Sequence, residues 1–254
     1  MRIVVKETAE EVDVAAAQEV AKQLLARPGS VLGLSTGNTT IGLHRAIVRL
    51  HRECGISFAE AITFNVDEYA EVAPDHPGSC RVRIFEQLLD GIDIRRENCH
   101  LPDGQAADFE EEARSYERRI EQAGGIDLQI LGVGMNGHIG FNEPGTSFES
   151  GAHVAVISGR SLSDKSDFYR RTGFSPRQAV TLGIRNIMQA RKIVLVAKGA
   201  AKVEIMRKGL FGPVTPDVPV SILQLHPDTL VLMDAAAGGQ TAHGGRGRPP
   251  GPVR

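Results

Sequence analysis

With 254 residues the chain is long enough to bury one sizeable core, and its 41% apolar and 24% charged content is typical of a globular protein. A formal net charge of -2 gives no bulk attraction for a polyanion, so we do not predict a nucleic-acid partner. The three cysteines share no CxxC spacing, which favours free thiols in a reducing compartment over a disulfide framework or a zinc site.

The chain begins without the long apolar segment of a signal peptide, and no apolar segment approaches the length of a membrane span. We therefore expect a cytoplasmic protein that has no membrane partner. Its first residues, 2–6, alternate in polarity as a strand does. Thr8 and Glu11 then form a capping-box pattern ahead of apolar residues at helical spacing, and Pro28-Gly29 ends that helix.

The rest of the chain continues to alternate between strand and helix patterns. Strands are predicted at residues 31–34, 61–66, 126–131, 154–157, 178–183 and 192–197. Helices are predicted at residues 41–52, 81–89, 108–123, 161–171, 184–190 and 198–210. Two further segments, 220–225 and 229–233, complete the regular structure. This alternation predicts one α/β domain over residues 1–234, in which a parallel sheet carries helices on both faces. Residues 235–254 are rich in Ala, Gly and Pro and have little to bury, so we predict a disordered tail.

The first site motif is a loop of small polar residues, Ser35–Thr40, that connects strand 31–34 to helix 41–52. Backbone N–H groups and hydroxyls at the positive end of a helix bind anions, so Thr36, Gly37, Asn38 and Thr39 are candidate phosphate ligands. The loop has neither a Walker motif nor a dinucleotide fingerprint, which favours a small phosphorylated ligand over ATP or NAD. An ordinary capped helix is the structural alternative.

Charged residues follow two other strands. Asp67 and Glu68 come directly after strand 61–66, and because successive side chains of an extended segment point to opposite sides, at most one of them should face a pocket. Solvation of both carboxylates is the alternative. Lys202 is predicted in the first turn of helix 198–210, where a cation opposes the helix dipole unless it binds an anion; a plain exposed lysine is the alternative.

The most informative stretch follows strand 126–131 and places four glycines within nine residues, 132–140. Glycines at this density allow positive φ angles and close approach to a ligand. Between and after them lie Asn136, His138 and Glu143: an imidazole that titrates near neutrality, an amide that can orient it and a carboxylate that can share its proton. We therefore predict a catalytic centre here, although a glycine-rich turn whose histidine bonds a backbone carbonyl remains the alternative.

Four segments occur in an order that resembles the glucosamine-6-phosphate deaminase/isomerase family, and the likeness covers nearly all of residues 1–234. They are Thr36-Gly37-Asn38-Thr39, Thr63-Phe64-Asn65-Val66-Asp67-Glu68-Tyr69, Gly134-Met135-Asn136-Gly137-His138-Ile139-Gly140-Phe141-Asn142-Glu143-Pro144 and Leu223-Gln224-Leu225-His226. The resemblance implies a Rossmann-like parallel sheet, no redox cofactor, and conversion of an amino-sugar phosphate to fructose 6-phosphate and ammonia. It does not define the number of subunits, and a homo-oligomer is one of the arrangements it allows.

By position, the resemblance implies that Asp67 is the general base for enolisation and that His138, with Asn136 and Glu143, opens the pyranose ring. The residues 36–39 and Lys202 would bind the phosphate. No cluster of metal ligands is recognisable, and none of these steps requires a metal.

The chain departs from the family pattern at several positions. Some members have an aspartate where this chain has Asn136, and an amide can orient the imidazole without stabilising imidazolium by charge. The usual phosphate-binding arginine falls at or near Asp167, so either Arg170 or Arg171 replaces it or the phosphate is held less tightly in this chain. Residues 77–80 and 165–167 look more like the galactosamine-6-phosphate branch. The basic positions that bind an activator in some members are not recognisable around His153 and Ala155, so we do not predict that regulation.

Two other functions fit parts of the pattern. A 6-phosphogluconolactonase would share the phosphate loop and the histidine loop but has no need of an enolising carboxylate, so Asp67 favours the deaminase. A non-catalytic sugar-phosphate sensor of a transcription regulator should have lost an acid/base group and should carry a helix-turn-helix segment. Asp67, His138 and Glu143 are all present, so we rank the sensor lower.

Overall fold

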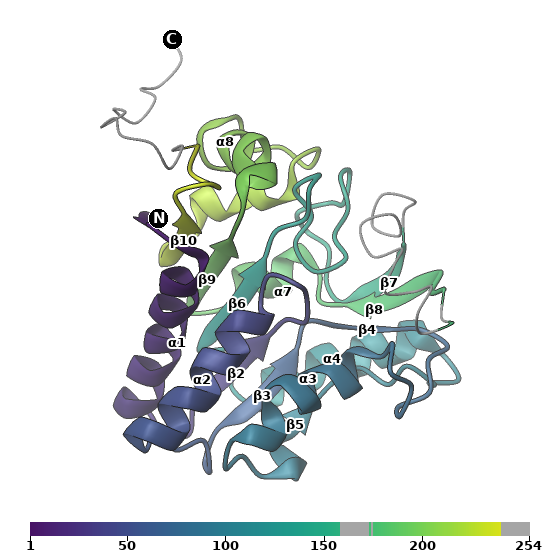
Figure 1. Cartoon of the computed structure of the whole chain (residues 1–254). Helices are drawn as coiled ribbons and strands as arrows, with labels where there is room; N and C mark the ends of the chain where they lie inside the picture. The colour runs from purple at the N-terminus through teal and green to yellow at the C-terminus, as the bar shows by residue number, and fades with distance from the viewer. Residues whose placement is uncertain (158–172, 174, 240–254) are drawn as a thin grey trace.

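The computed structural model describes residues 1–157, 173 and 175–239 of the chain (Figure 1). Its main sheet has seven strands, all parallel, in the order β1-β10-β9-β6-β2-β3-β5. They are β1 Arg2–Lys6, β2 Val31–Leu34, β3 Ile62–Asn65, β5 Cys99–His100, β6 Leu128–Gly132, β9 Lys192–Ala197 and β10 Thr229–Asp234. This arrangement confirms the predicted α/β class with a parallel sheet.

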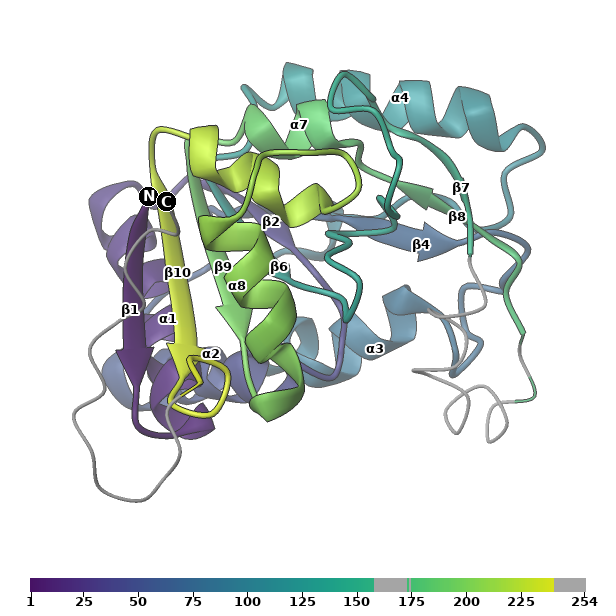
Figure 2. The ribbon, with the colours of Figure 1, turned by 90° about the horizontal axis from the view of Figure 1, so that it is seen from above.

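Helices cover both faces of the sheet, as Figure 2 shows from above. On one face lie α1 Ala9–Ala26, α2 Ile41–Cys54 and α3 Cys80–Gln87; on the other lie α4 Phe109–Gln122, α7 Ile184–Met188 and α8 Val203–Phe211. Short 3₁₀ turns lie between these elements: η1 Leu89–Gly91, η2 Arg96–Asn98, η3 Ala200–Lys202 and η4 Pro219–Leu225. None of the helices in the part of the chain that the structure describes is long and apolar enough to cross a membrane.

The buried strands divide their side chains between two hydrophobic clusters, one under each helical layer. In β6, Leu128 and Ile130 face the α1–α2–α3 layer, whereas Leu131 faces the opposite layer. Alternate residues of a strand point to opposite faces, so a strand covered on both sides is apolar throughout. At 25 cal/mol per Å², each fully buried Leu or Ile stabilises the fold by about 1.5–3 kcal/mol.

The helix starts are encoded locally. The hydroxyl of Thr8 accepts the backbone N–H of Glu11 at 3.2 Å, and the carboxylate of Glu11 accepts the N–H of Glu7 at 3.0 Å. The predicted N-terminus of this helix is therefore confirmed. Lys202, however, lies in η3 one residue before α8 begins, rather than within the first turn of a continuous helix.

A second sheet of three antiparallel strands, ordered β4-β8-β7, was not predicted. Its strands are β4 Asp67–Tyr69, β8 Gln178–Thr181 and β7 His153–Val156. The shortest of them, β4, contains two carboxylates and has no alternating apolar pattern, so its strand character depends on backbone pairing with β8, more than 100 residues later.

The last strand, β10, ends at Asp234, and the first residues of the predicted tail lie within the described part of the chain. Residues 235–239 form a turn after β10, in which Ala237 is buried and its N–H donates to Oδ1 of Asp234 at 2.7 Å. These five residues therefore pack back against the end of β10. Residues 240–254 of the predicted tail lie outside the described residues, as do the predicted helix 161–171 and its basic side chains.

Candidate functional site

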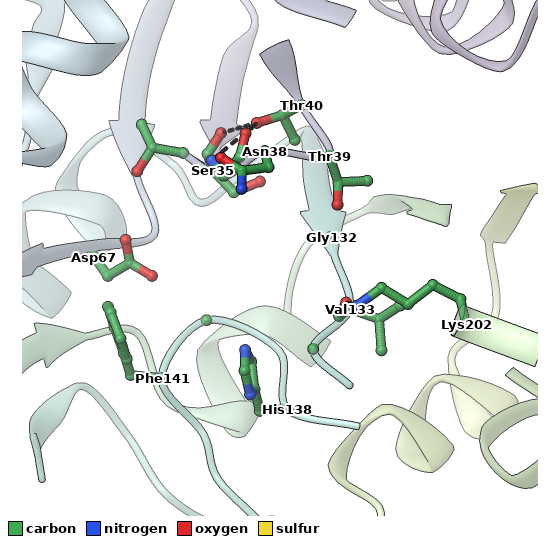
Figure 3. A pocket seen from close by; sticks show the side chains of 14 residues that line it. Ser35, Asn38, Thr39, Thr40, Asp67, Gly132, Val133, His138, Phe141 and Lys202 are labelled. Atoms are coloured by element: carbon green, nitrogen blue, oxygen red, sulfur yellow. Dashed lines mark hydrogen bonds between the residues drawn. The ribbon is translucent and has the colours of Figure 1, made fainter. Parts of the chain in front are cut away.

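The site lies at the point where the strand order of the main sheet changes direction. From β2 the chain proceeds to β3 on one side, whereas from β6 it proceeds to β9 on the other, and β2 and β6 are neighbours. The loops that follow such neighbouring strands separate and leave a crevice at their carboxyl ends, which is where open α/β sheets bind ligands. A pocket occupies this position (Figure 3).

The pocket is formed by the loop after β2, the loop after β6, the start of β4 and the turn before α8. Its lining residues are Ser35, Thr36, Gly37, Asn38, Thr39, Thr40, Asp67, Gly132, Val133, Gly134, His138, Gly140, Phe141 and Lys202. Segments that are widely separated in the sequence thus present hydroxyls, a carboxylate, an imidazole and an ammonium group to one space. Such a mixture suits a small polar anion better than an apolar ligand.

The loop after β2 is shaped by its last residue. The Thr40 hydroxyl accepts the N–H of Gly37 at 3.2 Å and also contacts the carbonyl oxygens of Ser35 and Gly37 at 3.1 Å each. The hydroxyls of Ser35 and Thr36 are buried and find no hydrogen-bond partner within the described part of the chain. Buried hydroxyls without a partner are costly, which favours a ligand that bonds to them.

The first turn of α2 is already occupied by a carboxylate from α1. Asp13 is buried against this turn so closely that a Cβ on Gly42 would lie 1.9 Å from its Oδ2, and its Oδ1 accepts the Lys198 ammonium at 2.7 Å. Burial raises the pKa of Asp13, while the hydrogen bond from Lys198 opposes that shift. The dipole of α2 is therefore partly neutralised, and an anion in the pocket depends more on the loop and on Lys202 than on the helix terminus.

The loop after β6 fixes the orientation of the His138 ring. The amide of Asn136 donates through Nδ2 to Oε2 of Glu143 at 2.6 Å, so its Oδ1 is an acceptor. That oxygen receives the backbone N–H of His138 at 3.2 Å and lies 2.8 Å from Nδ1 of the same residue. Nδ1 therefore carries the proton, and Nε2 carries the lone pair of the neutral ring. Oε1 of Glu143 lies 3.4 Å from Nδ1 and favours the protonated imidazole when it forms.

Glycines make this loop possible in two ways. Gly137 and Gly140 have φ angles of 91° and 59°, a region that residues with a Cβ rarely adopt. Gly134 instead provides space, because a Cβ there would lie 2.2 Å from Cε1 and 2.4 Å from Nε2 of His138. The imidazole is therefore packed directly against a backbone without a side chain.

The two adjacent carboxylates point to different sides of β4, as predicted. Asp67 lines the pocket, whereas Glu68 points away and accepts the backbone N–H groups of Tyr69, Cys80 and Arg81 at 2.8 Å each. Both side chains are buried, so solvation of both is excluded. Burial raises the pKa of Glu68 to about 7, although the three N–H donors oppose the shift.

Lys202 reaches the pocket from the opposite wall. Its ammonium donates to the carbonyl oxygen of Val133 at 2.8 Å, which holds the side chain across the loop after β6 (Figure 3). This contact places the positive charge beside the pocket instead of in bulk solvent.

A buried histidine lies in the first turn of α2, directly after the pocket loop 35–40. We expect this histidine to lower the stability of the folded protein in acid. His44 of α2 is 1% exposed, and its Nδ1 contacts Oε1 of Gln87 at 3.1 Å. Burial lowers the pKa of His44 from 6.5 to about 4, and the positive charges of Arg83 and Lys198 act in the same direction. The unfolded chain therefore binds more protons between these pH values, and stability falls as the pH decreases through this range.

From this difference we expect the wild type to lose on the order of 3 kcal/mol of unfolding free energy between pH 6.5 and pH 4 through His44 alone. A His44→Gln variant should lack that part of the slope. Because the chain has no Trp, denaturant unfolding would be followed by circular dichroism at a series of pH values. Parallel slopes for the two proteins would contradict the prediction.

The family model described as "Glucosamine-6-phosphate isomerases/6-phosphogluconolactonase" matches residues 5–232 of the chain. The chain belongs to this family. The glucosamine-6-phosphate deaminase of Thermoanaerobacter pseudethanolicus is 43% identical over 93% of this chain and 94% of that protein. The enzyme of the same name from Clostridium botulinum is 41% identical over 93% of this chain and 97% of that protein.

Solved structures agree with this family assignment. A monomeric glucosamine-6-phosphate deaminase superimposes with a TM-score of 0.92 at 37% identity, covering 95% of this chain and 100% of that chain. A 6-phosphogluconolactonase from Trypanosoma brucei superimposes with a TM-score of 0.74 at 21% identity, covering 94% and 97% of the two chains. At that identity the second likeness concerns the fold alone.

In this member of the glucosamine-6-phosphate isomerase/6-phosphogluconolactonase family, seven of the nine predicted site residues line the pocket. They are Thr36, Gly37, Asn38, Thr39, Asp67, His138 and Lys202. The other two, Asn136 and Glu143, do not line the pocket; they contact each other and the imidazole of His138. The other seven lining residues were not predicted as site residues, although all belong to the two stretches that the sequence analysis singled out. They are Ser35 and Thr40 of the loop 35–40, and Gly132, Val133, Gly134, Gly140 and Phe141 of the glycine-rich stretch.

The positions predicted to replace the phosphate-binding arginine, Arg170 and Arg171, and the neighbouring Asp167, lie outside the described residues. Within the ranges 1–157 and 175–239, no group of three or more His, Cys, Asp or Glu side chains is placed to hold a metal ion.

Proposed function

We propose that this protein is a glucosamine-6-phosphate deaminase, which isomerises glucosamine 6-phosphate and, with water, releases fructose 6-phosphate and ammonia. The observation that supports this proposal best is that Asp67 and His138 line one pocket together with the hydroxyl loop and Lys202. The relatives at 41–43% identity are named for the same activity. The lactonase alternative has no use for a buried carboxylate at position 67.

The phosphate would bind first and define the position of the sugar. The hydroxyls of Ser35 and Thr36 lack partners among the described residues, and the charge of Lys202 lies on the other side of the same pocket. Hydroxyls and an ammonium group together provide the donors that a phosphate dianion requires. With the phosphate held there, the hexose extends toward Asp67 and His138.

His138 would open the pyranose ring. The anomeric hydroxyl must lose a proton and the ring oxygen must gain one as the bond between C1 and the ring oxygen breaks. Because Nδ1 is protonated toward Asn136, Nε2 can accept the first proton and return it to the ring oxygen. The carboxylate of Glu143, 3.4 Å from Nδ1, stabilises the transient imidazolium.

Asp67 would then move the proton from C2 to C1. Removal of the C2 proton by Asp67, with transfer of a proton from the substrate ammonium group to O1, forms the enolamine, and delivery of the C2 proton to C1 gives a protonated ketose imine at C2. Water adds to this imine, and the resulting carbinolamine expels ammonia. A buried carboxylate suits this role, because water that solvates a carboxylate weakens it as a base, and burial removes part of that water.

The experiment that tests this function is incubation of the wild type with glucosamine 6-phosphate and, separately, with galactosamine 6-phosphate, followed by an ammonia assay. Release from the gluco substrate is expected. Release from the galacto epimer alone would assign the other branch, which residues 77–80 suggested from the sequence. Hydrolysis of 6-phosphogluconolactone without ammonia release would replace the proposal by the lactonase.

Asn136 offers a test of the proton relay. Asn136→Asp places a second carboxylate beside Nδ1 of His138 and next to Glu143, whose Oε2 is now 2.6 Å from the amide. The added negative charge stabilises imidazolium, so the acid limb of the pH profile of kcat should move to higher pH, by about one unit. An unmoved limb would show that residue 136 does not act on the imidazole.

A further inference from the structure

The first turn of α3 holds both carboxylates of the segment 67–68. Glu68 accepts the backbone N–H groups of Cys80 and Arg81, the first two residues of the helix. Asp67 accepts the side chain of the same cysteine, because the Cys80 thiol donates to its Oδ1 at 3.6 Å. One residue of α3 therefore contacts both acidic side chains, one through its backbone and the other through its sulfur.

The contact between the Cys80 thiol and the Asp67 carboxylate is buried. Cys80 is 2% exposed and Asp67 is 7% exposed, so water has little access to the bond between them. The cysteine is not among the residues that line the pocket, whereas the aspartate is. A donor fixed on one carboxylate oxygen limits rotation of the group and favours its ionised form.

We propose that Cys80 is a positioning residue for Asp67, which its thiol holds in one orientation toward the pocket. This inference rests on the role of Asp67 as the base in the proposed function. Cys80 itself touches no reacting atom; it acts through the carboxylate. The anchor is rigid because Ser79 caps α3, its hydroxyl accepting the N–H of Val82 at 3.0 Å, and because Glu68 ties the same turn to β4.

The test compares Cys80→Ala with the wild type in steady-state kinetics. Loss of one weak hydrogen bond to a charged base should lower kcat by about fivefold to tenfold. KM should stay within about twofold, because the phosphate contacts are untouched. The acid limb of the pH profile should move to higher pH, since ionised Asp67 has lost a donor. A purely structural role would lower the melting temperature without moving this limb.

Cys99→Ala is the matched control. Cys99 is also buried, and its thiol donates to a backbone carbonyl, that of Arg95, at 3.5 Å, away from the pocket. This variant should keep the wild-type kcat and pH profile. Cys80→Ser should recover part of kcat, because a hydroxyl is a stronger donor but its shorter bond leaves it farther from Oδ1.

A spectroscopic measurement reports on the contact independently of turnover. The S–H stretching band of a buried thiol shifts to lower frequency when the thiol donates to a carboxylate. The S–H band of Cys80 is identified as the one that disappears in Cys80→Ala. In Asp67→Asn this band should move to higher frequency, because an amide oxygen is a weaker acceptor than a carboxylate. An unmoved band would overturn the contact.

The outcomes separate this inference from the function on which it rests. A wild type that releases ammonia, combined with an unchanged kcat and pH profile in Cys80→Ala, would overturn the role of Cys80 alone. A wild type that releases no ammonia from either amino sugar would overturn the proposed function, and the role of Cys80 with it.

Discussion

Asp67→Asn is expected to lower kcat for ammonia release by about three orders of magnitude, within the range by which a positioned general base accelerates proton transfer. The amide has the same shape as the carboxylate, and its oxygen can still accept the Cys80 thiol, so the geometry should persist. What it lacks is the ability to take the C2 proton. Exchange of that proton with deuterated solvent should therefore be lost together with ammonia release.

Two controls make the Asp67→Asn result specific. Asp75→Asn removes an exposed carboxylate eight residues further along the chain and should leave kcat unchanged. Thermal unfolding followed by circular dichroism should show that Asp67→Asn is folded, since the pairing of β4 with β8 uses backbone groups. A folded Asp67→Asn protein with near wild-type turnover would remove the carboxylate from the reaction.

Gly134→Ala is expected to lower kcat by about a hundredfold, because displacing a catalytic group by roughly 1 Å has an effect of that size. The new Cβ would lie 2.2–2.4 Å from three atoms of the His138 ring, far inside contact distance. The ring must tilt away, which lengthens its 2.8 Å contact with Asn136 and moves Nε2 from the sugar. Binding of the phosphate should change little, since the loop 35–40 is not displaced.

The appropriate control for the glycine is Gly29→Ala. Gly29 lies outside the positive-φ region, and the only atom near an added Cβ is the carbonyl oxygen of Glu60 at 3.9 Å, an ordinary contact. This variant should keep wild-type kcat and KM. If Gly134→Ala also kept them, the imidazole would have to tolerate displacement, and a reacting role for His138 would be difficult to maintain.

The class of fold, and the convergence of the candidate site residues on one pocket, followed from local patterns. Buried strands are apolar throughout because both faces are covered, so β2, β6 and β9 were recognisable from the sequence. The start of α1 was equally clear, since its cap is formed by residues three apart. Hydroxyl and glycine loops after such strands meet at the carboxyl edge of a parallel sheet, which predicted that 36–39 and 136–143 would share a site.

Other features of the fold and the pocket depend on contacts between residues that lie far apart in the sequence, which no local pattern connects. The strand β4 exists because β8 pairs with it, and the first turn of α2 lies against the carboxylate of Asp13 from α1, which in turn accepts the ammonium of Lys198 after β9. The local pattern left open which of the two adjacent carboxylates faces the pocket, although the family resemblance implied Asp67. The tertiary structure alone shows which residue contacts that carboxylate: Cys80, thirteen residues later.

The physical reason is the range of the interactions. Periodicity, capping and turn chemistry act over a few residues, so the amino-acid sequence by itself determined the elements of this protein and the loops that carry its polar groups. Contacts between side chains on different elements depend on how helices pack over the sheet. That packing alone decided the partners of Asp67, Asp13 and His44 and the space that Gly134 leaves for the imidazole.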